Sequence, residues 1–155
     1  MRYIYIALFG FCGAVVRFLL ESALPATVWT AAILGGAPFP LTTLLVNAVG
    51  CFVLPLIFVY AARASSLPVD VASGMGVGLV GAFTTLSTFC SETIELLQAG
   101  FIVAAVVYVV LTMVTSLGAS WLGYALGTRM LKRHRARNLA ELRGLSASGG
   151  DDHAA

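Results

Sequence analysis

The sequence predicts an all-α membrane protein with four transmembrane helices, and its composition is the main reason. Hydrophobic residues make up 59% of the 155-residue chain, charged residues make up 10%, and the mean hydropathy is +0.95. A soluble domain has about 45–50% apolar and about 25% charged residues. A chain of this length holds four spans of roughly 20 residues each with short loops. We expect one four-helix transmembrane domain over residues 1–130 and a tail over residues 131–155.

The first span is predicted at about residues 4–20. Gly10 and Gly13 form a small-residue patch that suits close packing against another helix. Arg17 is the only strong base inside a predicted span. It can pair with Glu21 at i+4, or its head can snorkel to the membrane interface. We favour a structural role for Arg17 over a chemical one.

The second span is predicted at about residues 41–62, after a first loop rich in proline and glycine. Asn47 is its most informative residue, because an amide at membrane depth is costly unless it is used. Two uses are open: a hydrogen bond between helices, or a ligand contact through its NH₂ donors. Gly50 lies three residues on, on nearly the same face, and would let a neighbour approach. Pro55 should kink the second half of the helix.

The third span, at about residues 71–97, contains the most unusual stretch of the chain, GAFTTLSTF from Gly81 to Phe89. In hydrocarbon, each hydroxyl group must find a partner or line a wet cavity. A series of glycines precedes it and predicts either close packing or an interruption of the helix. The glycines are Gly74, Gly76, Gly78 and Gly81, and the hydroxyl-bearing residues are Thr84, Thr85, Ser87 and Thr88.

The fourth span is predicted at about residues 101–126. Tyr108, Thr112 and Ser116 recur at i, i+4 and i+8, so they form one polar stripe on an otherwise apolar helix. The tail that follows is first basic and then rich in Ser, Gly and Asp, and we expect its end to be disordered.

The basic residues are concentrated after the fourth span. This concentration predicts that the tail lies in the cytoplasm, and it is compatible with a contact to anionic lipid. A nucleic-acid partner is not expected for a tail attached to a membrane bundle. The residues are Arg129, Lys132, Arg133, Arg135, Arg137 and Arg143.

The polar groups predicted at membrane depth are neutral and can donate hydrogen bonds. No acid or base is predicted at the middle of a span, and we interpret Glu92 and Glu95 as carboxylates at the membrane interface. This pattern excludes transport through a buried carboxylate and offers no nucleophile–base pair for an enzyme. The residues alone therefore predict a small channel or transporter with a neutral polar pathway, and they do not identify the ion.

Three motifs, GFCGAVVRF, FPLTTLLVNAVGCF and GLVGAFTTLSTF, resemble the Fluc (CrcB) family of fluoride channels. The resemblance covers roughly residues 4–128. It implies an antiparallel, dual-topology dimer of four-helix subunits with two pores at the subunit interface. It also implies passive export of fluoride across the inner (plasma) membrane of the cell, and hence fluoride resistance.

The resemblance implies a role for particular residues. Gly81 and Thr84 match positions where the third helix breaks mid-membrane and backbone carbonyls hold a structural Na⁺. Arg17 matches the first-span arginine of the family. The implied fluoride pathway comprises Asn47, Phe89, Ser87, Thr88, Tyr108, Thr112 and Ser116.

Two features depart from the family pattern. Leu86 stands where the family usually has a phenylalanine, which removes one aromatic ring from the ion pathway. The positive charges also fall on one side of the predicted topology, whereas a dual-topology homodimer should be nearly unbiased. We therefore hypothesise that the subunit is one half of a heterodimer with an oppositely oriented paralogue. The alternative is an exporter like those of the small multidrug-resistance family, which needs an embedded carboxylate that only Glu21 could approach.

Overall fold

The computed structural model describes residues 2–23, 39–61 and 68–151, and the described residues are almost entirely helical, with no strand among them. Four stretches are long and apolar enough to cross a membrane, which confirms the predicted fold class of an all-α protein with four spans. They are Arg2–Ala23, Leu41–Val59, Val69–Gln98 and Ile102–Ala140.

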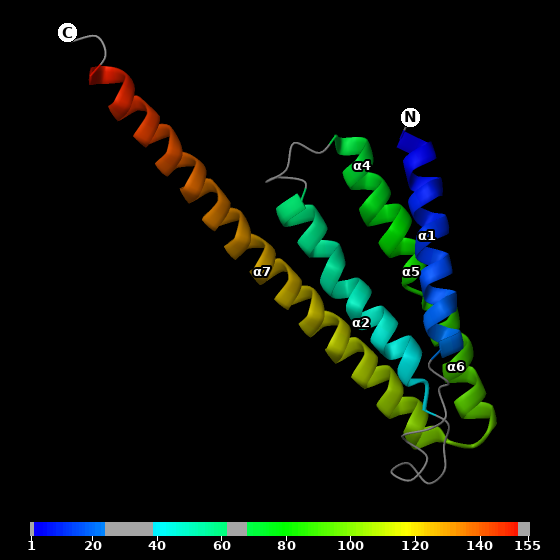
Figure 1. Ribbon diagram of the computed structural model, residues 1–155. Helices are drawn as coiled ribbons and strands as arrows, with labels where there is room; N and C mark the ends of the chain where they lie inside the picture. The colour runs from blue at the N-terminus through cyan, green and yellow to red at the C-terminus, as the bar shows by residue number, and fades with distance from the viewer. Residues whose placement is uncertain (1, 24–38, 62–67, 152–155) are drawn as a thin grey trace.

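The second and third spans are built from several helical segments (Figure 1). In the second, α2 (Leu41–Leu56) continues as a π-helical turn, η1 (Ile57–Ala61). Pro55 lies just before η1 and has no N–H to donate to the helical hydrogen bonds. The irregularity in the second half of this span is therefore found beside Pro55, as the sequence predicts. The third span comprises α4 (Val69–Ser73), the π-helical η2 (Gly74–Val80), α5 (Gly81–Phe83) and α6 (Leu86–Gln98).

The bundle is held by two closely packed pairs. The first helix, α1 (Arg2–Ala23), lies along η2, and α2 lies along α7 (Ile102–Asp151) (Figure 1). Glycine permits both contacts. A Cβ atom on Gly13 would collide with the backbone oxygen of Leu79, and one on Gly78 would lie 2.5 Å from that of Ile6. Gly13 and Gly78 therefore serve close packing, as the small-residue pattern predicts, whereas a Cβ atom on Gly81 would meet nothing within 4 Å.

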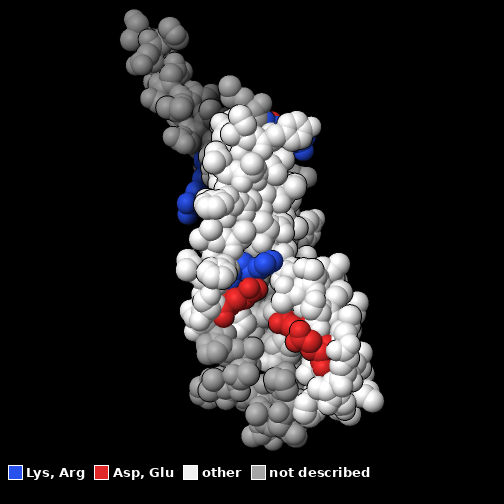
Figure 2. Space-filling view, turned by 90° about the vertical axis from the view of Figure 1, so that its right-hand side faces the viewer, with Lys and Arg blue, Asp and Glu red and all other residues white. Residues whose placement is uncertain are grey.

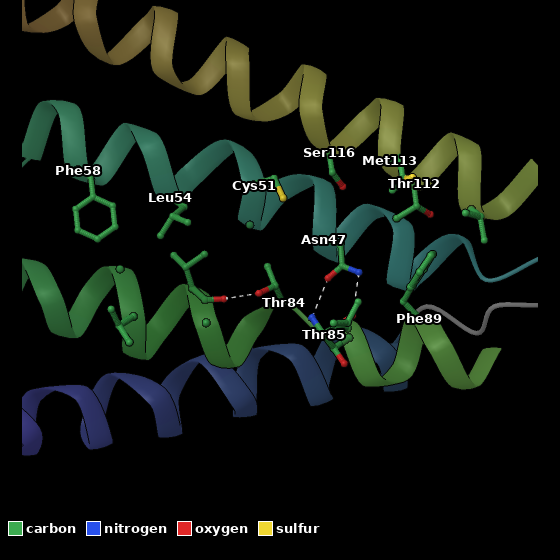
Figure 3. A pocket seen from close by; sticks show the side chains of 17 residues that line it. Asn47, Cys51, Leu54, Phe58, Thr84, Thr85, Phe89, Thr112, Met113 and Ser116 are labelled. Atoms are coloured by element: carbon green, nitrogen blue, oxygen red, sulfur yellow. Dashed lines mark hydrogen bonds between the residues drawn. The ribbon is translucent and has the colours of Figure 1, made fainter. Parts of the chain in front are cut away.

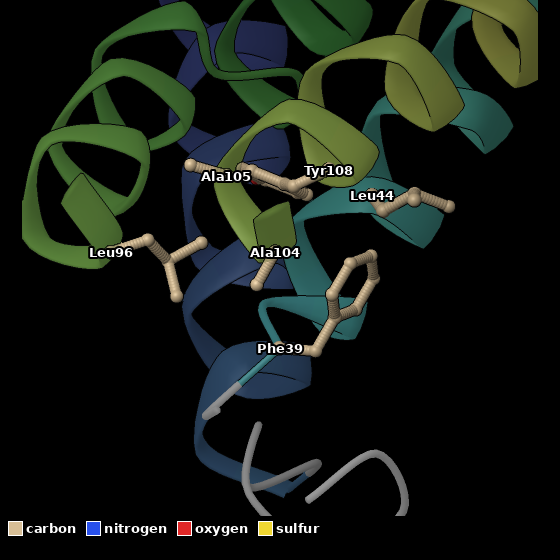
Figure 4. Close-up of a cluster of buried hydrophobic side chains, with 6 residues drawn as sticks. All are labelled: Phe39, Leu44, Leu96, Ala104, Ala105 and Tyr108. Atoms are coloured by element: carbon tan, nitrogen blue, oxygen red, sulfur yellow. The ribbon is translucent and has the colours of Figure 1, made fainter. Parts of the chain in front are cut away.

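A hydrophobic cluster closes the end of the bundle where α2 begins, α6 ends and α7 begins (Figure 4). The ring of Tyr108 is fully buried in it and meets the ring of Phe39 edge-on, with the ring centroids 5.5 Å apart. The members are Phe39, Leu44, Leu96, Ala104, Ala105 and Tyr108. This cluster fixes the start of α2, the end of α6 and the start of α7 around the site described below.

The α7 helix is 50 residues long, or about 75 Å, whereas a bilayer core of about 30 Å needs roughly 20 residues. It runs past the other helices, and both ends of the described chain lie at the same end of the bundle (Figure 1). The sequence predicts disorder at the end of the tail, whereas α7 continues as a helix to Asp151. The reason is that residues 129–143 are rich in Leu, Ala, Arg and Lys, which favour helix and outweigh the Ser and Gly that follow.

The outer surface is largely uncharged, as expected for helices in contact with lipid. Figure 2 shows a broad zone without Lys, Arg, Asp or Glu, and most charges on this face gather in small groups. Exposed side chains include Phe11, Phe18 and Trp121. Such a surface is stable only when hydrocarbon or another subunit covers it.

The contact between α1 and η2 gives a prediction for stability. Gly13→Ala should destabilise the protein by about 1–3 kcal/mol, because its Cβ meets backbone that cannot yield easily. Gly118→Ala is the matched control: its Cβ meets nothing within 4 Å, so the higher helix propensity of alanine should stabilise by up to about 1 kcal/mol. Thermal unfolding in detergent measures both. Equal unfolding temperatures for the two variants would contradict the packing argument.

Candidate functional site

The third span is interrupted at two residues, Thr84 and Thr85. Thr84 has φ −76° and ψ 152°, and Thr85 has φ −143° and ψ 116°, so both are extended between α5 and α6. The interruption begins directly after the glycine series and lies within the hydroxyl-rich stretch. Extended backbone at this depth exposes polar groups that hydrocarbon cannot satisfy, so other parts of the chain must provide partners.

Asn47 of α2 supplies two of these partners. Its Oδ1 accepts the N–H of Thr85 at 2.8 Å, and its Nδ2 donates to the carbonyl of Thr85 at 3.1 Å (Figure 3). One side chain thus satisfies both backbone groups of one extended residue. Of the two uses open to Asn47, a hydrogen bond between helices is what the structure shows. Because Nδ2 carries two hydrogens, one of them remains for another acceptor.

Gly50 allows Asn47 to come this close. A Cβ atom at Gly50 would collide with the Cγ2 atom of Thr84, so only glycine lets α2 approach the interruption. Gly50 lies one turn after Asn47 on nearly the same face. The spacing of Asn47 and Gly50 in the sequence therefore places both residues where α2 contacts the interruption.

The interruption also releases backbone carbonyls from helical hydrogen bonding, and those of Gly81 and Thr84 are among them. In a continuous helix, the N–H groups of Thr85 and Thr88 would bond to the carbonyls of Gly81 and Thr84. Here the N–H of Thr85 goes to Asn47, and the N–H of Thr88 goes to the Oγ1 of Thr85 at 3.1 Å. The carbonyls of Gly81 and Thr84 thereby lose their helical donors, and they are the two that the family resemblance assigns to Na⁺.

The hydroxyl groups that follow cap the start of α6. Thr85 is its N-cap residue, and its Oγ1 donates to the Oγ1 of Thr88 at 2.9 Å and lies 3.3 Å from the Oγ of Ser87. Thr84 turns the other way and donates its hydroxyl to the carbonyl of Val80 at 3.0 Å. The four hydroxyls therefore divide between the two helix ends at the interruption, and those of Thr85, Ser87 and Thr88 gather at the start of α6.

A cavity of about 630 Å³ opens beside the interruption, between α2, the third span and α7 (Figure 3). Most of its lining is apolar or glycine, and no charged residue lines it. Gly81 and Phe89 also border it. The polar lining residues are Asn47, Thr84, Thr85, Thr112 and Ser116.

Thr112 is the most informative of these side chains. It is 7% exposed, and its Oγ1 has no hydrogen-bond partner among the described residues. A buried hydroxyl without a partner costs free energy, unless a ligand or water occupies the cavity that it lines. Thr115, three residues away, instead bonds to its own helix through the carbonyls of Leu111 and Thr112 at 2.7 and 3.2 Å.

Tyr108 is the one residue of the predicted polar stripe that does not line the cavity. Its hydroxyl donates to the Oε2 of Glu92 at 2.7 Å, while Thr43 donates to Oε1 of the same carboxylate, also at 2.7 Å. Its ring contacts that of Phe89, with centroids 5.2 Å apart. Phe89 therefore lies between the cavity and this Thr43–Glu92–Tyr108 group.

The Thr43–Glu92–Tyr108 group is the part of the site that the sequence did not reveal. We interpreted Glu92 as an interfacial carboxylate, but its two oxygens connect α6 to α2 and α7. Glu92 lies one turn beyond Phe89 on α6, and Tyr108 lies one turn before Thr112 on α7. The sequence offered one signal for this group: the carboxylate of Glu92 lies one helical turn from Phe89, an aromatic residue of the predicted pathway.

The remaining predicted residues lie at the edge of this arrangement. Ser87 and Thr88 do not line the cavity; they surround the hydroxyl of Thr85. Leu86 does line it and is 75% exposed. Arg17 lies on α1, and its Nε is 3.4 Å from the Oε1 of Glu21, which confirms the predicted i,i+4 pair.

Comparison with known proteins agrees with this geometry. The family model described as CrcB-like protein, Camphor Resistance (CrcB), matches residues 4–124. A relative from Listeria innocua serovar 6a named fluoride-specific ion channel FluC 2 is 35% identical over 133 residues, covering 86% of this chain and 95% of that protein.

A second relative, from Bacillus thuringiensis subsp. konkukian, is named fluoride-specific ion channel FluC 1. It is 39% identical over 132 residues, which cover 85% of this chain and 91% of that protein. The family-model match includes the residues of the interruption and those that line the cavity. This chain belongs to the CrcB family.

Proposed function

We propose that this chain is a subunit of a fluoride-specific channel that releases fluoride passively from the cytoplasm across the plasma membrane. The observation that supports it best is the cavity in which Asn47 holds the interruption and Thr112 presents a buried hydroxyl without a partner. Its relatives are named for the same ion. A multidrug exporter is not supported, since the relatives compared here are fluoride channels.

The lining chemistry suits a small, strongly hydrated anion. Asn47 has one N–H left after its bond to Thr85, and Thr112 has its hydroxyl, so both can donate to fluoride. The ring edge of Phe89 carries positive partial charge and adds a weaker attraction. Because no cation lines the cavity, fluoride would exchange its water for neutral donors and still leave, as conduction requires.

We place the next step of the pathway beyond Phe89, at the Thr43–Glu92–Tyr108 group. The hydroxyl of Tyr108 donates a hydrogen bond to the Oε2 of Glu92 at 2.7 Å, and a passing anion could compete with this carboxylate for the donor. Ser116, which lines the cavity, and Ser87 and Thr88, beside Thr85, would complete the polar surroundings. Fluoride that entered the cell as neutral HF and dissociated there would leave by this route without energy coupling.

Flux measurements on matched variants test this pathway. Thr112→Val and Tyr108→Phe each remove one hydroxyl with little change in shape. Because a hydrogen bond to a charged group contributes about 1.5–3 kcal/mol, fluoride efflux from proteoliposomes that contain the variant together with its conducting partner subunit should fall about tenfold or more. Asn47→Asp, which also places a negative charge in the cavity, should reduce it further.

Two neighbouring variants serve as controls. Thr115→Val removes a hydroxyl that bonds only within α7, and Tyr124→Phe alters an exposed ring on the same helix. Both should conduct like the parent. Unreduced efflux in Thr112→Val, with a normal size-exclusion profile, would refute the role of Thr112 in the pathway.

We propose further that the carbonyls of Gly81 and Thr84 contribute to a structural Na⁺ site at the dimer centre. The support is that both lose their helical donors at the interruption, and carbonyl oxygens are ligands suited to such a cation. Among the described residues no group of three or more His, Cys, Asp or Glu offers another metal site. The ion would neutralise backbone dipoles at membrane depth.

Thermal unfolding tests the Na⁺ site independently of flux. Replacing N-methylglucamine by Na⁺ should raise the unfolding temperature, with about 1.4 kcal/mol gained per tenfold increase in Na⁺ above its Kd. In Asn47→Leu the N–H of Thr85 can return to the carbonyl of Gly81, so this dependence should weaken. The same unfolding temperature in Na⁺ and N-methylglucamine would exclude the site.

The channel requires a second subunit, which we propose inserts in the opposite direction. Leu86, Val77 and Met113 line the cavity and are 75%, 56% and 62% exposed, so its mouth offers apolar surface to a partner. Arg2 and the basic tail share one end, while residues 22–40 and 98–100 contain no Lys or Arg. This bias favours a paralogue over a second copy.

Reconstitution tests the composition of the dimer. The chain alone should give little fluoride efflux, and co-expression with a family member of the opposite charge bias should restore it. Full efflux from the chain alone would show a homodimer instead. If neither preparation transported fluoride, the channel function itself would be wrong.

A further inference from the structure

We propose that the basic stretch of α7 just beyond the membrane is a binding site for the headgroups of anionic phospholipids. This stretch comprises five exposed side chains that follow the last apolar turn of the fourth span. They are Arg129, Lys132, Arg133, Arg135 and Arg137. The inference does not depend on which ion passes through the protein.

The charges of this stretch form no ion pair among the residues that the structure describes. The sequence contains no Asp or Glu between Glu95 and Glu141, and the one ion pair among the described residues joins Arg17 to Glu21. Uncompensated charge at this density repels itself and attracts counterions. Because the stretch is continuous with a membrane-spanning helix, phospholipid phosphates are the nearest lasting source of negative charge.

The helical phase directs most of these charges to lipid. Gly123, Gly127 and Leu131 recur every four residues; the two glycines pack on α2 and η1, and Leu131 is buried. Arg129, Lys132, Arg133 and Arg137 recur at i, i+3, i+4 and i+8, which places them on another face that is turned away from α2. They form one stripe, the basic stripe, and all four are exposed.

The distances also fit a headgroup layer. From Arg129 to Arg137 the helix rises about 12 Å. The headgroup region adds about 5–7 Å to each side of the hydrocarbon, and the Debye length at physiological salt is about 8 Å. The whole basic stripe therefore lies within reach of the negative surface potential. Figure 2 shows basic side chains beside the part of α7 that leaves the bundle.

Trp121 offers a way to measure lipid at this site. It is 70% exposed and lies eleven residues, or three turns, before Lys132 on the same side of α7. The chain has two tryptophans, so Trp29→Phe leaves Trp121 as the single tryptophan. Phospholipids brominated on their acyl chains quench a tryptophan in contact with them.

The experiment compares two brominated lipids in symmetric bilayers of fixed composition: phosphatidylglycerol, which is anionic, and phosphatidylcholine, which has no net charge. In the Trp29→Phe protein, Trp121 should be quenched several-fold more strongly by brominated phosphatidylglycerol, and high salt should reduce the preference. Because the bilayer is symmetric, the direction of insertion does not affect the result.

Two variants decide the role of the basic stripe. Arg129→Gln with Lys132→Gln, Arg133→Gln and Arg137→Gln should abolish the preference, whereas replacing the three arginines by lysine should retain it. Circular dichroism and size-exclusion chromatography would verify folding. Equal quenching by the two lipids in the parent protein would overturn the proposal and favour an acidic macromolecule as partner. A preference that persists in the glutamine variant would also overturn it.

Discussion

The pairing of the Asn47 side chain with the backbone of Thr85 is the interaction on which the site depends. It satisfies both backbone polar groups of the extended residue Thr85 at a depth where water is scarce, and so supports the interruption of the third span. The same pairing diverts the N–H of Thr85 from the carbonyl of Gly81, leaves one N–H of Asn47 for the cavity, and requires glycine at position 50. Structure and chemistry are therefore not separable at Asn47: a substitution that removes a donor to the ion also removes the support of the interruption.

The second structural constraint is the way in which hydroxyl groups are distributed. Thr84, Thr85, Ser87 and Thr88 bond to one another or to nearby backbone, so the third span largely satisfies itself. The hydroxyl that remains without a partner is on α7, at Thr112. In the proposed pathway, ion contact falls to residues of α2 and α7 placed opposite the interruption, and the hydroxyl-rich stretch supplies the shape of the cavity more than its donors.

Much of this arrangement could be predicted from the sequence, because the bilayer restricts the choices. Apolar length predicts the spans, and an amide beside glycine at membrane depth indicates that Asn47 is used. What could not be predicted is which face of each helix meets which neighbour. Glu92 is separated from Thr43 by 49 residues and from Tyr108 by 16, and only the packed bundle shows that both donate to it. The continuation of α7 was missed for a different reason: composition near the end of the chain favoured disorder, while the helix-forming residues before it propagate the helix.

The length of α7 has a consequence for how the protein responds to its membrane. Thr112 and the basic stripe belong to one uninterrupted helix, so the vertical distance between the cavity and the bilayer surface cannot change by bending at a joint. A thinner or thicker bilayer must instead be accommodated by tilting the whole subunit or by deforming the lipid around it. The distance along α7 between Thr112 and the basic stripe is fixed. The hydrophobic thickness of the host membrane therefore affects the tilt of the subunit and the lipid around the cavity.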